Sequence, residues 1–158
     1  MNKKVMFISS TGGHFTEMMQ LKSLFDKYDY SIVTEKTKSH YKTLKESYGK
    51  KISFLIYGTK DKPISYIFKL FINCWISLFL FIKYRPKYII TTGAHTAGPM
   101  CCIGKIFRSK IIFIESFANV TSKTVTGNII YKFADLFIVQ WPEMIKVYPK
   151  AKYVGGVF

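Results

Sequence analysis

The sequence contains few acidic residues. Asp and Glu account for only 9 of the 158 residues, against 24 Lys and Arg, so the formal net charge is +15. This imbalance favours an anionic partner, which could be nucleic acid, an acidic membrane surface or a phosphorylated substrate. Lysine that only keeps an apolar domain soluble is the alternative explanation. No helix-turn-helix or RNA-binding signature accompanies the charge, so we do not expect nucleic acid to be the partner.

Cysteine is also scarce. Cys74, Cys101 and Cys102 form neither a CxxC pair nor a Cys/His spacing typical of metal sites. We therefore expect no disulfide framework, no metal and no cofactor, and a reducing cytosolic compartment fits best. We expect no signal peptide either, because the basic residues Lys3 and Lys4 precede only a short apolar stretch before polar loop residues follow.

Apolar residues are abundant: 49% of the residues are hydrophobic and 17% are aromatic. Such a composition argues against a disordered chain. Apolar runs of strand length alternate with segments of helical periodicity, as in a parallel sheet covered by helices on both faces. We predict a single doubly wound, Rossmann-like α/β domain over residues 1–158. The expected strands lie near 4–9, 30–34, 52–57, 87–92, 111–115, 135–140 and 151–154. One helix is expected between the first two strands, and others over about 38–48, 64–82, 97–107 and 121–133.

The third of these helices is unusually apolar. Residues 64–82 read ISYIFKLFINCWISLFLFI, which is close to the lower length limit of a membrane span. The exceptions recur at every fourth position and form one polar stripe on a helix: Ser65, Lys69, Asn73 and Ser77. Three interpretations are open: a membrane span, a helix wholly buried in the core, and a helix with one side on the sheet and another in the membrane interface. We favour the third, because a span would place a lysine in the hydrocarbon and break the α/β alternation.

Under this interpretation, a membrane-associating helix at about 64–84 attaches the protein peripherally or by shallow insertion. Lysine and arginine side chains then lie near acidic headgroups, and aromatic rings lie at the interface. The basic residues concerned are Lys60, Lys62, Lys69, Lys83, Arg85 and Lys87. The aromatic residues are Tyr66, Trp75 and Tyr84.

Three polar loops follow predicted strands, and ligands of an open parallel sheet bind beyond the carboxyl ends of its strands. The paired glycines of the first loop allow close backbone approach, so a phosphate or diphosphate is the natural ligand. A tight turn that needs glycine only for its backbone angles is the alternative. The candidate residues of this loop are Ser10, Thr11, Gly12, Gly13 and His14.

The second and third loops offer hydroxyl, imidazole and carboxylate groups. A carboxylate at the end of a strand can accept hydrogen bonds from sugar hydroxyls or act as a base, although a helix cap or ion pair is the structural alternative. The candidates are Thr92, Gly93, His95 and Pro99 in the second loop, and Glu115 and Ser116 in the third. Glu35, after the second strand, leaves a dinucleotide ribose site open, although neither GxGxxG nor Walker A is matched.

Together, SSTGGHFTEM, TGAHTAGP and ESFANV resemble the three signature loops of the membrane-associated subunit of two-component glycosyltransferases. The first resembles the family's SS-x-GGH-x-x-EM opening, and the resemblance covers essentially the whole chain. That family includes the subunit that recruits an N-acetylglucosaminyltransferase partner in dolichol-linked oligosaccharide synthesis. Bacterial relatives act in capsular or exopolysaccharide assembly. The family's fold is similar to the N-terminal, acceptor-binding half of MurG-type GT-B glycosyltransferases.

The resemblance implies a subunit of a hexosyltransferase that binds a polyprenyl-diphosphate-linked sugar at the cytoplasmic face of the plasma membrane. A separate donor-binding glycosyltransferase subunit would hold the UDP-sugar and form a heterodimer with this chain, which would be inactive alone. The sequence ends where a fused enzyme would continue into its donor-binding half, in line with this expectation. A non-catalytic membrane scaffold that only activates the partner is the alternative.

The resemblance also assigns residues. Gly12, Gly13 and His14 match the loop that faces the acceptor diphosphate, and we expect His14 to be a ligand of that group, the catalytic base or a structural residue. Glu115 is the other candidate base. Two departures stand out: Asn119 replaces a residue that is frequently basic in the family, and the N-terminal span of the eukaryotic subunits is not expected here. Membrane attachment would then rest on the 64–84 helix.

Overall fold

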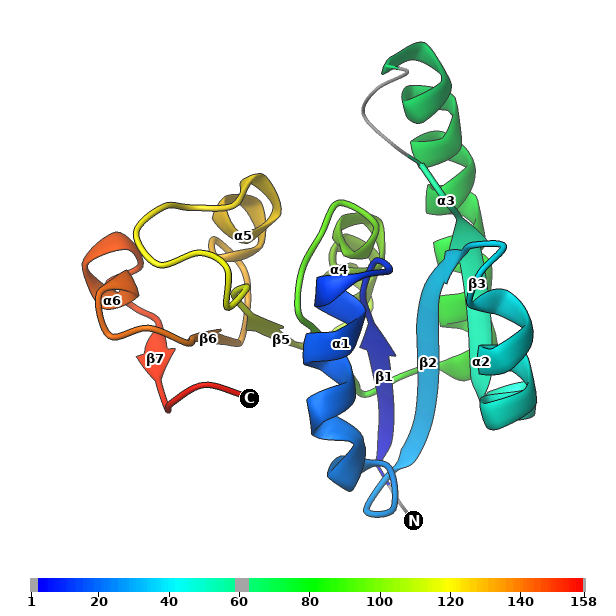
Figure 1. Ribbon diagram of the computed structural model, residues 1–158, viewed down its shortest axis with the longest axis horizontal. Coiled ribbons are helices and arrows are strands. Elements are labelled where there is room, and N and C mark those ends of the chain that lie inside the picture. Colours follow the sequence, from blue (N-terminus) through cyan, green and yellow to red (C-terminus); the bar gives the residue numbers. More distant parts are fainter. Residues whose placement is uncertain (1–2, 59–62, 158) are drawn as a thin grey trace.

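The computed structural model describes residues 3–58 and 63–157, and its strands form one parallel sheet in the order β3-β2-β1-β4-β5-β6-β7. This confirms the predicted doubly wound architecture (Figure 1). All seven predicted strands are present, with ends displaced by at most two residues. They are β1 (Lys4–Ile8), β2 (Asp29–Lys36), β3 (Ile52–Ile56), β4 (Tyr88–Thr91), β5 (Lys110–Ile114), β6 (Leu136–Val139) and β7 (Lys152–Tyr153).

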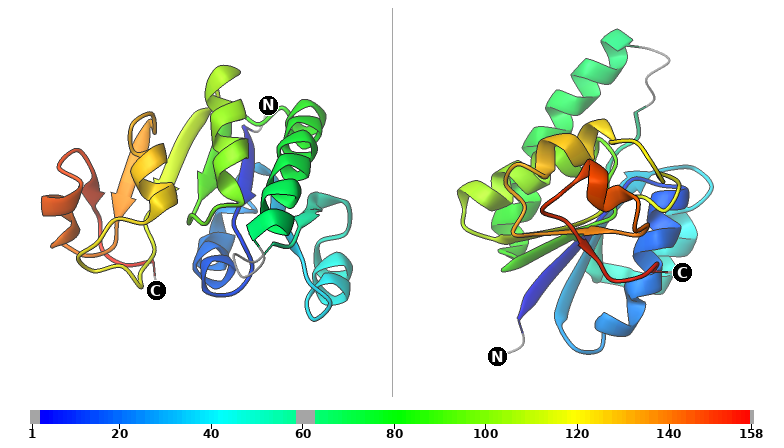
Figure 2. Two further views of the ribbon diagram at one scale, coloured as in Figure 1. Left: turned by 90° about the horizontal axis from the view of Figure 1, so that it is seen from above. Right: turned by 90° about the vertical axis from the view of Figure 1, so that its left-hand side faces the viewer.

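Both faces of the sheet are buried, because alternate residues of each strand point to opposite sides. In β1, Val5 and Phe7 belong to one apolar cluster, and Met6 and Ile8 belong to the other. The first cluster is covered by α1 (Gly13–Met19), the 3-10 turn η1 (Gln20–Leu24) and α2 (Tyr41–Tyr48). The second is covered by α3 (Pro63–Tyr84), α4 (Ala97–Ile106), α5 (Val125–Ile130) and α6 (Met144–Val147), as the two layers in Figure 2 show.

Two helical predictions need correction, and one helix was missed. The expected 121–133 helix is only α5, because residues 117–124 form an irregular loop and Thr124 starts the helix by accepting a hydrogen bond from the Gly127 N–H at 2.9 Å. The expected 38–48 helix begins at Tyr41, after a turn that includes Ser39. The helix α6 was not predicted, since four residues are too few to show helical periodicity.

The polar stripe of α3 faces the protein. Asn73 and Ser77 are buried, and the Asn73 side chain accepts a hydrogen bond from the Ile56 N–H (2.8 Å) and donates one to the Ile56 carbonyl (2.9 Å). The amide side chain therefore satisfies the backbone groups of Ile56, the last residue of the edge strand β3. Tyr84 also turns inward, with its hydroxyl 2.8 Å from that of Ser53, so it is not an interfacial aromatic residue.

The opposite face of α3 is apolar and exposed, so the interpretation of a wholly buried helix is wrong. Little of the helix is buried, and by length and composition it is long and apolar enough to cross a membrane. Its first turns project past the end of the sheet (Figures 1 and 2). The exposed residues are Ile64, Ile67, Phe68, Phe71, Ile72, Trp75, Phe79 and Ile82. Lys83 and Arg85 are exposed beside them and Lys69 is half-buried, whereas Lys60 and Lys62 lie outside the described residues.

Candidate functional site

The loops that follow β1 and β4 meet at the point where the strand order reverses. These strands are neighbours in the sheet, yet β1 leads into α1 on one face and β4 leads toward α4 on the other. Such a switch point opens a crevice at the carboxyl ends of the strands. Gly12 (φ 79°) and Gly93 (φ 101°) adopt left-handed backbone angles there, which glycine tolerates best.

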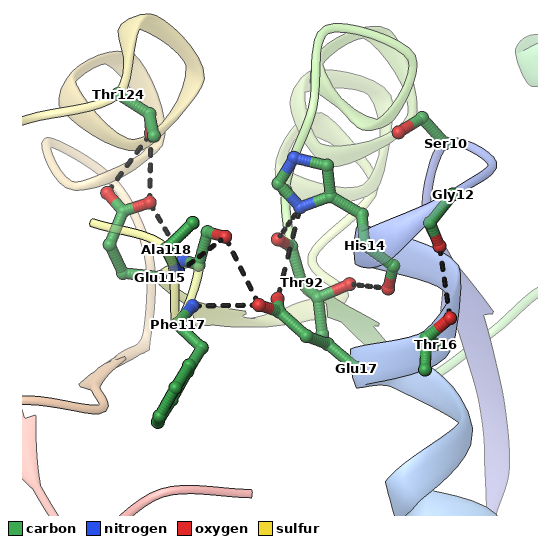
Figure 3. Close-up of polar contacts among 12 residues, drawn as sticks. Ser10, Gly12, His14, Thr16, Glu17, Thr92, Glu115, Phe117, Ala118 and Thr124 are labelled. Atoms are coloured by element: carbon green, nitrogen blue, oxygen red, sulfur yellow. Dashed lines mark hydrogen bonds and ion pairs between the residues drawn. The ribbon is translucent and has the colours of Figure 1, made fainter. Parts of the chain in front are cut away.

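His14 and Thr92 join the two loops through two hydrogen bonds. The Thr92 hydroxyl donates to the His14 carbonyl at 2.7 Å, and His14 Nδ1 lies 2.9 Å from the Thr92 carbonyl oxygen. A carbonyl oxygen can only accept, so Nδ1 carries hydrogen and the neutral ring keeps its lone pair on Nε2. Nε2 points away from Thr92 (Figure 3). The imidazole is therefore fixed through Nδ1 and free to accept a proton through Nε2.

Glu17, one turn after His14, ties α1 to the third loop. Its Oε1 accepts hydrogen bonds from the Phe117 N–H at 2.8 Å and from the Ser116 hydroxyl at 3.2 Å (Figure 3). Its Oε2 is buried without a hydrogen bond among the described residues and lies 4.0 Å from His14 Nδ1. Burial raises the pKa of Glu17 above its ordinary value, because the hydrogen bonds and the nearby His14 offset only part of the desolvation.

Glu35 ties the first loop to the second. The side chain is 2% exposed, its Oε1 accepts a hydrogen bond from the Thr96 hydroxyl at 2.7 Å, and its Oε2 accepts one from the Thr11 N–H at 3.4 Å. His95 Nε2 lies 3.5 Å from Oε1. Burial opposes the ionisation of Glu35, but hydrogen bonds from His95 and Thr96 outweigh it, so the pKa lies below its ordinary value. With its carboxylate engaged in this way, Glu35 is poorly placed to hold a ribose.

Glu115 organises the loop that leads to α5. Its side chain is 1% exposed, and both oxygens accept hydrogen bonds, from the Thr124 hydroxyl at 3.0 and 3.1 Å and from the Tyr148 hydroxyl at 2.8 Å. The Ser116 N–H donates to the same carboxylate at 3.0 Å. Desolvation and the nearby carboxylate raise the pKa of Tyr148, which therefore stays a neutral donor. Glu115 is thus bound as a buried anchor.

A cleft of ≈ 550 Å³ opens beside these loops. It is lined by two imidazoles and one ammonium group, from His14, His95 and Lys123, and none of its described lining residues is a carboxylate. Tyr66, from the first turns of α3, forms part of its wall and packs edge-on against His95 with ring centroids 5.1 Å apart. The other lining residues are Ala94, Asn119, Thr124, Val125 and Thr126. The cleft thus joins two imidazoles and one ammonium group to the apolar helix.

Two of the predicted site residues, His14 and His95, line this cleft. Gly93 stands directly behind it, because a Cβ there would lie 3.8 Å from His14 Cε1. The remaining predicted residues belong to the supporting loops, to the first residue of α1 or to α4, and are not among the described residues that line the cleft: Ser10, Thr11, Gly12, Gly13, Thr92, Pro99, Glu115 and Ser116. Among the described residues, no group of His, Cys, Asp and Glu is arranged to hold a metal ion.

Sequence reasoning missed Lys123 as a cleft residue and assigned Tyr66 to the membrane interface. Lys123 lies four positions after Asn119, the position at which the resemblance led us to expect a basic residue, and both side chains line the same cleft. The irregular 117–124 loop brings Lys123 there, so a helix predicted from position 121 concealed its location. The excess of lysine in the sequence was the only available signal.

The fold is that of sugar-nucleotide enzymes of the GT-B type. MurG from Acinetobacter baumannii superimposes with a TM-score of 0.73 at 15% identity over 98% of this chain and 45% of that protein. UDP-N-acetylglucosamine 2-epimerase from Rickettsia bellii gives a TM-score of 0.73 at 15% identity over 99% of this chain and 46% of that protein. The chain therefore spans less than half the length of these structures and shares their fold.

The family follows from the sequence of the whole chain. Residues 5–157 match the family described as "Oligosaccharide biosynthesis protein Alg14 like", and the chain belongs to that family. The mouse UDP-N-acetylglucosamine transferase subunit ALG14 is 26% identical over 98% of this chain and 82% of its own length. The Schizosaccharomyces pombe protein of the same name is 28% identical over 98% of this chain and 83% of its own length. These matches confirm the family resemblance drawn from the three loops.

Proposed function

We propose that this chain is the acceptor-binding, membrane-docking subunit of a glycosyltransferase that uses a UDP-sugar. One observation carries the proposal: a cleft lined by His14, His95 and Lys123 opens against the first turns of the exposed apolar helix α3. A polyprenyl-diphosphate-linked sugar has the matching chemistry, with an anionic diphosphate for the Lys123 ammonium group and the two imidazoles, and an apolar chain for the membrane at α3. The family membership supports the same role.

In the proposed reaction, an acceptor hydroxyl attacks the anomeric carbon of the donor sugar while the bond to the UDP leaving group breaks. The hydroxyl proton goes to a base, for which His14 Nε2 is the better placed candidate, because Glu115 is buried with both oxygens engaged. The carboxylate of Glu115 would instead hold the Thr124 end of the cleft. A separate donor-binding subunit, bound as a heterodimer, would supply the UDP-sugar.

The proposal places the chain at the cytoplasmic face of the plasma membrane, where α3 lies on or shallowly in an acidic bilayer. The exposed aromatic Trp75 and the basic Lys83 and Arg85 on or beside this helix support interfacial binding. For the biological setting we propose capsular or exopolysaccharide assembly. That setting rests on the motif resemblance, since the relatives compared above are eukaryotic.

The test is sugar transfer by the full chain together with a donor-binding partner that co-purifies with it. Labelled sugar should pass from a UDP-sugar to a polyprenyl-diphosphate-linked sugar only when both proteins are present. Full activity of the isolated chain would contradict the two-subunit proposal. His14→Asn keeps a donor for the Thr92 carbonyl but removes Nε2, so loss of a base should lower kcat by roughly 10²-fold or more.

The same variant separates the alternatives. An unchanged kcat with a raised acceptor KM would make His14 a ligand of the diphosphate instead of the base. Full retention of both parameters would favour the non-catalytic scaffold, in which the chain only docks and activates its partner. Co-purification of His14→Asn with the partner is the control, because it shows that the assembled complex was measured.

A further inference from the structure

Glu35 is buried beside the cleft residue His95, and none of the chemistry proposed above uses it. Its carboxylate is held from three directions, by Thr11 of the first loop and by His95 and Thr96 of the second. Burial of a carboxylate is strongly unfavourable unless hydrogen bonds and nearby charges compensate for its desolvation. Of these partners, only His95 reaches the cleft.

We infer that Glu35 is a positioning residue, which orients the His95 imidazole so that its Nδ1 edge receives the acceptor diphosphate. The inference rests on the proposed function, because it assigns the ligand of the same cleft. The carboxylate stands 3.5 Å from Nε2, so the hydrogen of a neutral His95 belongs on Nε2. Nδ1 has no hydrogen-bond partner among the described residues and is left for a ligand.

The surroundings of His95 fix the ring on its other side. Tyr66 packs edge-on against it at 5.1 Å, and Thr96 next in sequence is anchored to the same Glu35 oxygen at 2.7 Å. These contacts restrict the rotamers of the ring before a ligand arrives, which lowers the entropic cost of binding. As an imidazolium, His95 would donate to Glu35 through Nε2 and to a phosphate oxygen through Nδ1. The proton for Nδ1 would come from solvent.

The same arrangement gives the two histidines of the cleft opposite orientations. His14 bonds through Nδ1 to the Thr92 carbonyl, with Glu17 Oε2 4.0 Å from the same nitrogen, and presents Nε2. His95 instead faces the Glu35 carboxylate through Nε2 at 3.5 Å and presents Nδ1. The hydrogen bond from Nδ1 to a carbonyl keeps the lone pair of His14 on Nε2, where a proton can be accepted. The carboxylate beside Nε2 of His95 keeps a hydrogen on that nitrogen and leaves Nδ1 directed at the ligand. The two imidazoles would therefore have different roles: His14 accepts the proton of the reacting hydroxyl, and His95 binds the diphosphate.

The first experiment needs neither a ligand nor the partner subunit. Long-range ¹H–¹⁵N NMR of the full chain in lipid nanodiscs reports which nitrogen of each neutral histidine carries hydrogen. We expect the Nε2–H form for His95 and the Nδ1–H form for His14 in the wild type. In Glu35→Gln, His95 alone should become a mixture. An Nδ1–H form of His95 in the wild type would overturn the inference, even if the variant failed to fold.

The second experiment uses inorganic pyrophosphate as the probe, titrated into the full chain at physiological salt. Glu35→Gln and His95→Ala should each weaken binding by roughly tenfold, and the double variant should bind no more weakly than His95→Ala alone. Additive losses would show that Glu35 acts independently of His95 and would overturn the inference. Asp135→Asn is the matched control, because this carboxylate also accepts hydrogen bonds from a backbone N–H and two lysines. Asp135 directly precedes β6 and so lies at the amino ends of the strands, away from the loops of the cleft.

The two experiments separate this inference from the proposed function. If the wild type binds no pyrophosphate, the proposed diphosphate site fails, and with it the ligand assigned to His95, whatever the tautomer. If pyrophosphate binds and the tautomer or the coupling is wrong, the proposed function stands and only the role of Glu35 is overturned.

Discussion

The side-chain amide of Asn73 pairs with both backbone groups of Ile56, accepting the N–H at 2.8 Å and donating to the carbonyl at 2.9 Å. One side chain of a long apolar helix thus takes the place of a strand neighbour for one residue at the edge of the sheet. The contact fixes the rotation of α3 about its axis, and this rotation directs Phe68, Phe71 and Trp75 outward. The buried Asn73 therefore determines which apolar residues of α3 are exposed.

This pairing can be tested by Asn73→Leu. The substitution would leave the N–H and the carbonyl of Ile56 without their partners, so the free energy of unfolding should fall by about 1–3 kcal/mol. Denaturant unfolding in a mild detergent measures the change. Trp75→Leu, two positions along on the exposed face, is the matched control and should change stability by less than about 0.5 kcal/mol. Equal effects of the two substitutions would contradict the assigned orientation of α3.

The exposed face of α3 should bind anionic membranes. Phe68→Ser and Trp75→Ser each remove a large apolar group, worth about 1.5–3 kcal/mol on full burial, so each should weaken vesicle binding about tenfold or more. Flotation with phosphatidylcholine vesicles, with and without phosphatidylglycerol, measures the loss and its dependence on lipid charge. Ile129→Ser changes an exposed apolar residue of α5 and should leave binding unchanged. Unaltered flotation of the α3 variants would refute this docking surface.

Two buried carboxylates should give opposite pH dependences of stability. Burial raises the pKa of Glu17 above 4.5, so its stabilising contribution is complete below pH 4.5 and is lost as the pH rises toward the folded-state pKa. Glu35 has a lowered pKa, so its contribution is present above pH 4.5 and is lost as the pH falls through the folded-state value. We would measure the free energy of unfolding of the wild type, Glu17→Gln and Glu35→Gln between pH 3 and 8. The difference between wild type and variant should change with pH in opposite directions for the two variants. Differences that change with pH in the same direction would contradict the opposite pKa shifts of Glu17 and Glu35.

Gly127 packs so closely against Glu115 that a side chain does not fit at this position. A Cβ on Gly127 would lie against the Glu115 carboxylate and 2.6 Å from the Thr124 hydroxyl, so Gly127→Ala should lower the free energy of unfolding by about 1–3 kcal/mol. Gly98→Ala, in α4, meets no atom within 4 Å and should be neutral or stabilising by about 0.5–1 kcal/mol. Thermal unfolding of the two variants makes the comparison. A stable Gly127→Ala variant would show that the loop can move away from Glu115.

Much of the fold was predictable because parallel strands and their helices carry strong local patterns. The seven apolar runs marked the strands, and the glycine loops marked the carboxyl edge of the sheet. The 117–124 loop was not predictable in this way. Its hydroxyl and amide side chains compete for backbone groups, and the start of α5 depends on Thr124, whose hydroxyl is held by Glu115 nine residues earlier.

The sequence by itself determined the parallel α/β architecture, the family, the three loops at one edge of the sheet, and a helix with a polar stripe in an apolar surface. All of these depend on residue type and local spacing. Only the tertiary structure decided that the stripe of α3 faces inward, that Glu17 and Glu35 join loops distant in sequence, and that Tyr66 and Lys123 reach the cleft. The physical reason is that such contacts pair groups tens of residues apart, and the buried partner that satisfies each polar group exists only once the sheet has formed.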